Sequence, residues 1–363
     1  MEAVLPYSLK IGIVTVMILA FTGLAVTLFF MIFIMKIRRL LIRKRNSRFE
    51  ETVKDQLNEV LAEYDEMSEP ERLSARKRVV GLIRTKWEKR LLADLLIHYK
   101  ANLYGSTEQF AVGLYYDLDL QVQNIRDLSA RSIRKKIRGI RYLSEMRCET
   151  AIQKIHQFIN HEQKLLRVEA SLALVSLNKN PLEFLDNLKR RMTDWQKINV
   201  YKKLRMLPLA QIPAFERWYD SKNTSVVLFA LEMTARFNQV HSKDKVAQLI
   251  HIDDERVQSQ VIRTLVQLEA FEYADVMARL LKIAQSERLI IDLLRAVGAL
   301  SMEEGHLEII SRFLIHKIHA IRFEAALAIV KIEKGPELLE SYVARYPQQL
   351  AIISKHMKND LLN

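Results

Sequence analysis

The longest hydrophobic pattern in the chain is an uncharged run of 25 residues near the N-terminus, residues 11–35. As an α-helix this run would be about 37 Å long, which exceeds the roughly 30 Å of a bilayer's hydrocarbon core. It is too long for the apolar part of a signal peptide, no small-x-small cleavage site follows it, and its positive charge comes after it. The pattern therefore predicts a retained transmembrane helix over 11–35, preceded by a short extracytoplasmic segment, 1–10.

Two amphipathic helical patterns follow the apolar run. The apolar positions of the first recur at helical spacing and are Val53, Leu57, Val60 and Tyr64. They predict a helix that leads away from the membrane and buries one face. The second pattern opens at Ser68, which begins a capping box that ends at Glu71 with proline in the first helical turn. This helix is predicted to continue to about Leu96.

A hydrophobic stripe repeats with a period of 32 residues in the C-terminal half. Its copies begin at Val257, Leu289 and Ile321, and apolar residues follow each start at offsets of 4, 5, 8 and 11. These residues are Val261, Ile262, Leu265 and Leu268 in the first copy, Leu293, Leu294, Val297 and Leu300 in the second, and Ala325, Ala326, Ile329 and Ile332 in the third. A helical stripe that recurs at a constant period predicts stacked helix pairs.

Looser copies of the stripe begin at Ile133, Leu166 and Val226, and short polar breaks such as Asp253-Asp254 between copies are suited to capping helices. The chain has only nine glycines and seven prolines, and no alternating β pattern. The predicted fold class is therefore all-α. Segment 36–125 is predicted to be a basic juxtamembrane segment with leading helices, and 126–363 a solenoid of stacked helix pairs.

Stretches such as RVEASLALVSL (167–177) and IRFEAALAIVKI (321–332) resemble HEAT repeats over roughly residues 125–345. Together with the N-terminal anchor, RSIRKKIRGIRYLSEM (131–146) and DWQKINVYKKL (194–204), they also look like the membrane-anchored HEAT-repeat proteins of Bacteroidota. Such proteins are often encoded beside a glycosyltransferase. The resemblance implies a HEAT-like α-solenoid with a part in envelope polysaccharide assembly.

The net charge of +13 is concentrated in two stretches. Residues 36–48 carry seven cations and no acid, and residues 126–147 carry eight basic residues against two acidic ones, so the rest of the chain is nearly neutral in sum. The seven juxtamembrane cations are Lys36, Arg38, Arg39, Arg43, Lys44, Arg45 and Arg48. Because Lys10 is balanced by Glu2 before the helix, this bias predicts a single-pass protein of the cell inner membrane with its N-terminus outside and its body cytoplasmic. The same cations are suited to anionic lipid headgroups.

The second basic stretch predicts a cationic ridge on one helix. Arg134, Arg138 and Arg141 recur at helical spacing, and Lys135 and Lys136 widen the ridge. Three interpretations stay open: a solvated helix face, a site for an acidic protein partner or anionic lipid, and a nucleic-acid site. The last is disfavoured because the tryptophans, which would stack on bases, are scattered along the chain.

The sequence offers little chemistry for catalysis. The single cysteine, Cys148, cannot form an intramolecular disulfide, and we expect it to be a small, half-buried helix residue. His161-Glu162 is the one dipeptide of the kind that di-iron HEAT enzymes repeat, and His316 and His319 lack further ligands at metal-binding spacing. We expect no metal, no cofactor and no enzymatic activity.

The resulting hypothesis is a non-catalytic, membrane-tethered scaffold or adaptor for a protein partner, such as a membrane glycosyltransferase or an export component. Two alternatives remain: a metal-dependent enzyme on a HEAT scaffold, and binding of nucleic acid or anionic lipid through the ridge.

Overall fold

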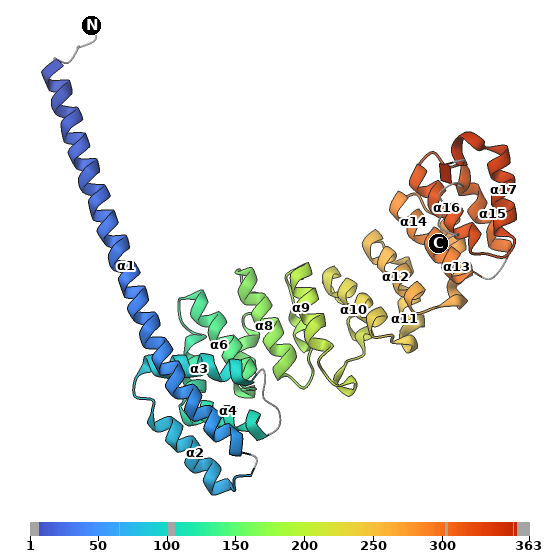
Figure 1. Ribbon diagram of the computed structural model, residues 1–363. Coiled ribbons are helices and arrows are strands. Elements are labelled where there is room, and N and C mark those ends of the chain that lie inside the picture. The colour runs from blue at the N-terminus through green and yellow to red at the C-terminus, as the bar shows by residue number, and fades with distance from the viewer. Residues whose placement is uncertain (1–6, 65, 101–105, 302–303, 351, 354–363) are drawn as a thin grey trace. The chain divides into compact units, whose positions relative to one another are not determined.

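The computed structural model describes residues 7–64, 66–100, 106–301, 304–350 and 352–353. Throughout these residues the ordered elements are α-helices and short 3-10 helices, with no strand among them, which confirms the all-α prediction. The chain divides into two compact units, Met1–Ala130 and Arg131–Asn363 (Figure 1).

The first unit begins with one unbroken helix of 57 residues, α1 (Tyr7–Glu63). From Val16 onward the side chains are exposed all along its apolar part. The helix is long and apolar enough to cross a membrane. The predicted transmembrane helix and the amphipathic helix after it are therefore parts of a single rod. The other helices of this unit are α2 (Glu69–Gly81), α3 (Lys86–Lys100), α4 (Ser106–Asp117) and α5 (Leu120–Asp127).

The C-terminal end of α1 forms part of the core of the first unit. Val53, Leu57, Val60 and Tyr64 are all buried, as their spacing predicts, and α1 packs against α2 and α3. The Tyr64 ring meets the Phe110 ring of α4 edge-on, with 5.0 Å between ring centroids. This packing fixes the apolar rod to the small helical body.

The prediction of one helix from Ser68 to about Leu96 is wrong in its second half. The capping box at its start is present, with the Glu71 carboxylate accepting from Ser68 N at 2.7 Å, but the helix ends at Gly81. A second box then starts α3. The Glu88 carboxylate accepts from the backbone N–H groups of Arg84 and Thr85, each at 2.8 Å. These bonds lower the pKa of Glu88, and they satisfy N–H groups at the start of the new helix.

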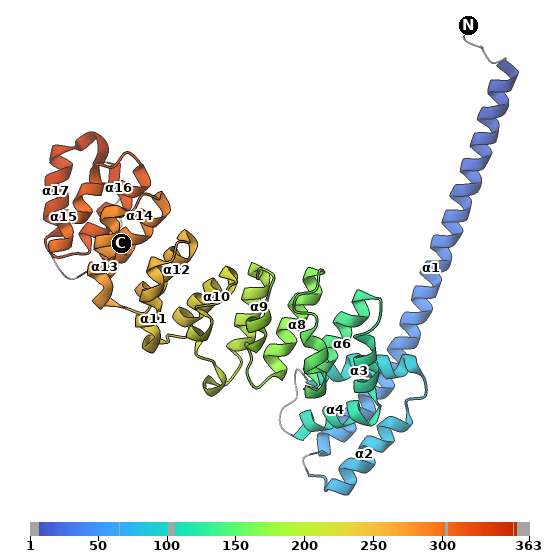
Figure 2. The ribbon, with the colours of Figure 1, turned by 180° about the vertical axis from the view of Figure 1, so that it is seen from behind.

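The second unit is a HEAT-like array of helix pairs. One row contains α6 (Ile133–Glu145), α8 (Lys164–Leu177), α9 (Asp194–Leu204), α10 (Thr224–Arg236), α12 (Glu255–Gln267), α14 (Glu287–Leu300) and α16 (His319–Val330). The helices of the other row are shorter, namely α7 (Ile152–His156), α11 (Lys243–Gln248), α13 (Ala274–Ile283), α15 (Gly305–Ser311) and α17 (Gly335–Arg345). Figure 2 shows the succession of pairs from behind.

The 32-residue stripe forms the contact surface within the row. Its residues on α12, α14 and α16 are buried, apart from Leu289, which is half-buried beside the fully covered Ile290. The earlier copies on α8 and α10 are also largely buried, while on α6 only Ile140 of the predicted Ile133, Ile137 and Ile140 is buried. The array is less regular after α9. There the 3-10 helices Leu209–Gln211 and Phe215–Trp218 take the place of a second-row helix.

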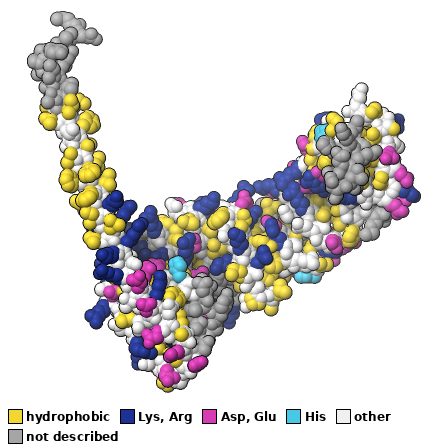
Figure 3. All heavy atoms as spheres, in the orientation of Figure 1, with side chains coloured by type: hydrophobic (Ala, Val, Ile, Leu, Met, Phe, Trp, Pro, Cys, Tyr) yellow, Lys and Arg dark blue, Asp and Glu magenta, His cyan; other side chains and the backbone are white. Residues whose placement is uncertain are grey.

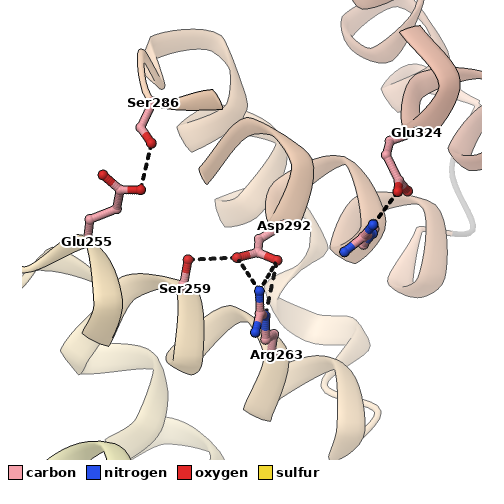
Figure 4. Close-up of polar contacts among 7 residues, drawn as sticks. Glu255, Ser259, Arg263, Ser286, Asp292 and Glu324 are labelled. Atoms are coloured by element: carbon pink, nitrogen blue, oxygen red, sulfur yellow. Dashed lines mark hydrogen bonds and ion pairs between the residues drawn. The ribbon is translucent and has the colours of Figure 1, made fainter. Parts of the chain in front are cut away.

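Polar contacts between successive row helices accompany the apolar ones. On α14 the buried carboxylate of Asp292 accepts from Ser259 Oγ at 2.6 Å and from the Arg263 guanidinium at 2.9–3.2 Å, both on α12 (Figure 4). Arg295 pairs in the same way with Glu324 of α16, and Arg141 of α6 with Glu169 of α8. An arginine on one row helix therefore repeatedly meets an acid on the next, about one repeat away.

Gly298 sits where α14 and α16 approach most closely, and its replacement by alanine is expected to destabilise the array. An added Cβ would lie 2.6 Å from Ala328 Cα, so backbone must move. Overpacking costs about 1–3 kcal/mol, which outweighs the helix-propensity gain of about 1 kcal/mol. Urea unfolding followed by circular dichroism measures the change. Gly305→Ala is the control, because nothing lies within 4 Å of its added Cβ, and an equal loss in both variants would contradict the close-packing explanation.

Candidate partner-binding groove

The loops that lead into the row helices share a side-chain hydrogen bond. In four of them a side chain accepts from the backbone N–H two residues later, at 3.0–3.2 Å, and the acceptors are His161, Asn223, Asp254 and His316. This bond satisfies one donor at the start of each helix. Arg256 also hydrogen-bonds Asp254, which lowers the pKa of that carboxyl. The polar breaks that contain Asn223 and Asp254 are thus helix caps, as predicted.

Of the three histidines considered as metal ligands, His161 and His316 have structural roles in these loops, and His319 is the first residue of α16. In both, Nδ1 accepts a backbone N–H, and an arginine six residues on donates to backbone carbonyls of the loop: Arg167 to His161 and Glu162, and Arg322 to His316 and Lys317. Among the described residues, no group of three or more His, Cys, Asp or Glu side chains is placed to hold a metal ion.

A serine–histidine–aspartate contact ties α13, α14 and α15 together. Ser301 Oγ meets Nδ1 of His306, and Nε2 of His306 lies 2.8 Å from Asp275 Oδ1. In serine hydrolases the serine faces Nε2 and the aspartate faces Nδ1, so this arrangement is inverted. Ser301 and His306 are only 8% and 7% exposed, so the serine is not presented to a substrate. The contact is structural.

An open groove with a volume of about 850 Å³ runs along the turns before α9 and α10 to Arg256 in the first turn of α12. Six cationic side chains line it, together with two aspartates. The cations are Lys189, Arg191, Lys197, Arg217, Lys222 and Arg256. Figure 3 shows Lys and Arg side chains gathered over the middle helices of the array.

Internal partners neutralise only part of this charge. Arg217 pairs with Asp186, which also accepts from Trp218 Nε1 at 2.7 Å, and Arg256 pairs with Asp254. The remaining four groove cations form no ion pair with any residue that the structure describes: Lys189, Arg191, Lys197 and Lys222. Arg190 stands beside them, and its charge adds to burial in lowering the pKa of Arg167. The groove therefore has an excess of positive charge.

A second, smaller depression of about 360 Å³ continues the groove past Arg191, which lines both. Its other walls include Lys164 at the start of α8, and Trp195 in the first turn of α9. Trp195 is 59% exposed, and Ile198, one helical turn further on, is 49% exposed. Large apolar side chains with this exposure next to a charged groove are typical of a protein-binding surface.

Sequence reasoning missed this groove because charge was summed over too long a stretch. Residues 187–222 contain nine basic and three acidic residues, a local net charge of +6. Acidic residues elsewhere in the chain cancel this excess in the total. The chain outside 36–48 and 126–147 is neutral in sum, but this segment is basic, and a sliding window of about 35 residues would have shown its local charge.

The predicted ridge on α6 is largely occupied by contacts within the array. Arg141 forms a two-bond ion pair with Glu169, which raises the pKa of Arg141, and Lys136 Nζ lies 5.2 Å from the centroid of the Phe158 ring. Arg138 is half-buried, whereas Arg134 and Lys135 are exposed. The five residues thus share a helix, but only part of the ridge faces solvent without a partner.

The seven juxtamembrane cations all lie on α1 and are exposed. Arg45 places its guanidinium carbon 4.1 Å from the centroid of the Trp87 ring on α3, and the same ring packs against Phe49. This cation–π contact uses one of the seven charges to hold α1 against α3 within the first unit. The isolated cysteine, Cys148, is fully buried and precedes the 3-10 helix Glu149–Ala151, so the expectation of a half-buried helix residue is wrong.

No protein-family model matches this chain, and no curated protein matches it in sequence. Among solved structures it is similar to an engineered protein, with 14% identity and a TM-score of 0.33 over 60% of this chain and 97% of that one. The complex of CpcE and CpcF of phycocyanin lyase from Nostoc sp. PCC7120 matches with 17% identity and a TM-score of 0.28, over 66% and 94%. A designed armadillo repeat protein matches with 12% identity and a TM-score of 0.30, over 58% and 98%.

The chain's own helices define its class. It is an all-α protein in which one long apolar helix precedes a HEAT-like α-solenoid.

Proposed function

We propose that this protein is a membrane-tethered, non-catalytic scaffold that binds a protein partner through the groove between the turns before α8, α9, α10 and α12. The observation that carries the proposal is the juxtaposition of the exposed Trp195 and four groove cations that form no ion pair with any described residue. Helical repeat arrays offer extended surfaces of this kind to other chains. Aromatic and cationic side chains supply much of the binding energy in protein interfaces.

The apolar part of α1 spans the membrane in this proposal, and the solenoid lies on the cytoplasmic side. The seven cations after the apolar run favour that orientation and interact with anionic headgroups. Confinement to the membrane raises the effective concentration of the scaffold toward a partner in the same membrane. A bacterial inner-membrane glycosyltransferase or envelope-export component fits this geometry, and it is the partner that the resemblance to Bacteroidota proteins implies.

Site-specific photocrosslinking in the native cell tests the scaffold function. A photoreactive phenylalanine analogue at Trp195 is expected to capture a specific protein from the membrane fraction. The same analogue at Ile283 on α13, which is more open to solvent than Trp195, is the control. The scaffold function fails if position 195 captures no protein, or captures only what position 283 also captures.

Cysteine labelling tests the topology. The native Cys148 is buried and gives little background, so cysteines are introduced singly in place of Glu2 and Ser47. A membrane-impermeant maleimide is expected to label position 2 in spheroplasts and to label position 47 only after lysis, because the positive-inside bias puts 36–48 in the cytoplasm. The reverse pattern would contradict the orientation, and labelling of both positions before lysis would contradict a membrane span.

A further inference from the structure

We infer that the groove receives an extended acidic segment of the partner protein, with one apolar side chain of that segment packed against Trp195. This inference rests on the proposed scaffold function and names the chemistry of the partner. It follows from the length of the groove, its charge, and the position of its one exposed aromatic residue.

The length of the groove fits a peptide better than a small anion. Its lining extends from Lys164 at the start of α8, past the turns before α9 and α10, to Arg256 in the first turn of α12. Neighbouring helices pack about 8–10 Å apart, so four helix ends span roughly 25–30 Å. An extended chain covers this distance with about eight residues at some 3.3 Å each. A single phosphate or carboxylate would occupy only one turn.

The charge of the groove selects an anionic segment. Four groove cations form no ion pair among the described residues: Lys189, Arg191, Lys197 and Lys222. The N-terminal ends of α9, α10 and α12 lie at the groove and add their partial positive charge to it. A capping side chain satisfies one N–H group at the start of each of these helices. The anionic segment is attracted to the charge at the groove and does not need direct bonds to the backbone. Glutamate and aspartate side chains at intervals along a peptide reach these cations.

The acidic residues of the walls favour a peptide over a nucleic acid. Asp186 and Asp220 line the groove between the cations, and Asp194 lines the depression beside Trp195. A nucleic acid presents a phosphate at each nucleotide and would meet these carboxylates, whereas a peptide can place neutral residues there. Trp218 offers no ring for base stacking, because it is only 4% exposed and donates its indole N–H to Asp186.

Trp195 and Ile198 supply the apolar end of the site. They lie one turn apart on α9 and are both exposed, and Trp195 lines the smaller depression together with Arg191, which joins the two depressions. An apolar side chain placed there is shielded by an aromatic ring while its acidic neighbours face the cations. This combination fixes the register of the segment, which charge alone does not.

Selection from a displayed library of random ten-residue peptides on the full-length protein, in detergent at low salt, tests the inference. Selected peptides are expected to be enriched in Asp and Glu with an apolar residue among them. The groove variant carries Lys189→Glu, Arg191→Glu and Lys222→Glu, and it is expected to bind them about tenfold or more weakly, since each exposed pair contributes up to roughly 1 kcal/mol. The matched control has the same change in net charge at three exposed lysines on α7, at the end of α13 and after α16: Lys154→Glu, Lys282→Glu and Lys331→Glu.

The outcomes separate this inference from the scaffold function. Acidic peptides that lose affinity in the groove variant and keep it in the control support the inference. Failure to select any peptide, peptides without acidic enrichment, or equal loss in both variants overturns it, while the crosslinking at position 195 independently decides whether the scaffold function stands. Displacement of the peptide by single-stranded oligonucleotide at lower concentrations than by free peptide also overturns it, in favour of nucleic acid.

Discussion

Replacing Arg263 with leucine is expected to lower the free energy of unfolding of the array by about 3 kcal/mol, because it leaves a buried carboxylate without its counter-ion. The side chain of Asp292 is only 2% exposed. In the variant, Ser259 is the hydrogen-bond partner that remains to it among the residues that the structure describes. Urea unfolding followed by circular dichroism measures the loss, and hydrogen exchange in α12 and α14 locates it.

The converse change separates the buried charge from simple loss of contact. Asp292→Leu leaves the guanidinium of Arg263 in reach of water, since that side chain is 49% exposed, so a smaller loss is expected. The double variant, Arg263→Leu with Asp292→Leu, is expected to recover most of the stability, as apolar replacements of buried ion pairs often do. A double variant as unstable as Arg263→Leu alone would show that the stranded carboxylate is not the cause.

Ser47→Pro is expected to break α1 between its apolar part and the helical body, at a cost of about 3 kcal/mol or more to the helix. Position 47 is exposed and lies in the middle of the unbroken helix, so proline removes a backbone hydrogen bond without disturbing a side-chain contact. Spin labels on cysteines at Arg39 and Asp55 of the full-length protein measure the result. In an intact helix the two positions are about 24 Å apart at 1.5 Å per residue, and the distance distribution is narrow.

The proline variant is expected to shorten and broaden that distribution. Ser47→Ala is the matched control, because it removes the same hydroxyl but keeps the helical hydrogen bond. A broad distribution already present in Ser47→Ala would mean that the two parts of α1 are not one rod.

The row helices were predictable because burial imposes a period on the sequence. Each of α12, α14 and α16 buries the same face against its neighbours, so apolar residues recur at Val257, Leu289 and Ile321. This stripe can be recognised in the sequence before the neighbouring helices are known. Helix caps were predictable where the residue was a familiar one, such as Asp254. His161 and His316 lie two residues before the cap position and accept a backbone N–H through Nδ1. Their type points as readily to metal binding, so the sequence alone could not assign this role.

Features that depend on the pairing of distant residues were not predictable. The ridge on α6 looks open in the sequence, yet Glu169, a repeat away, neutralises Arg141. In the groove the reverse is true, because Lys189 and Lys222 come from different turns and acquire a common surface only when the helices stack. The break before α3 was a simpler omission, since Thr85 and Glu88 have the capping-box spacing already recognised at Ser68.

Because α1 is one unbroken helix, a tilt of its apolar part also moves the helical body at its other end. From Met35 to Val53, where the buried face begins, the helix runs about 27 Å, and a tilt of about 20° in the bilayer would swing its far end sideways by roughly 9 Å. An apolar helix that is longer than the bilayer core accommodates the difference in part by tilting. If α1 spans the membrane as proposed, a thinner bilayer would move the helical body at the end of α1 across the membrane surface and change which neighbours it meets.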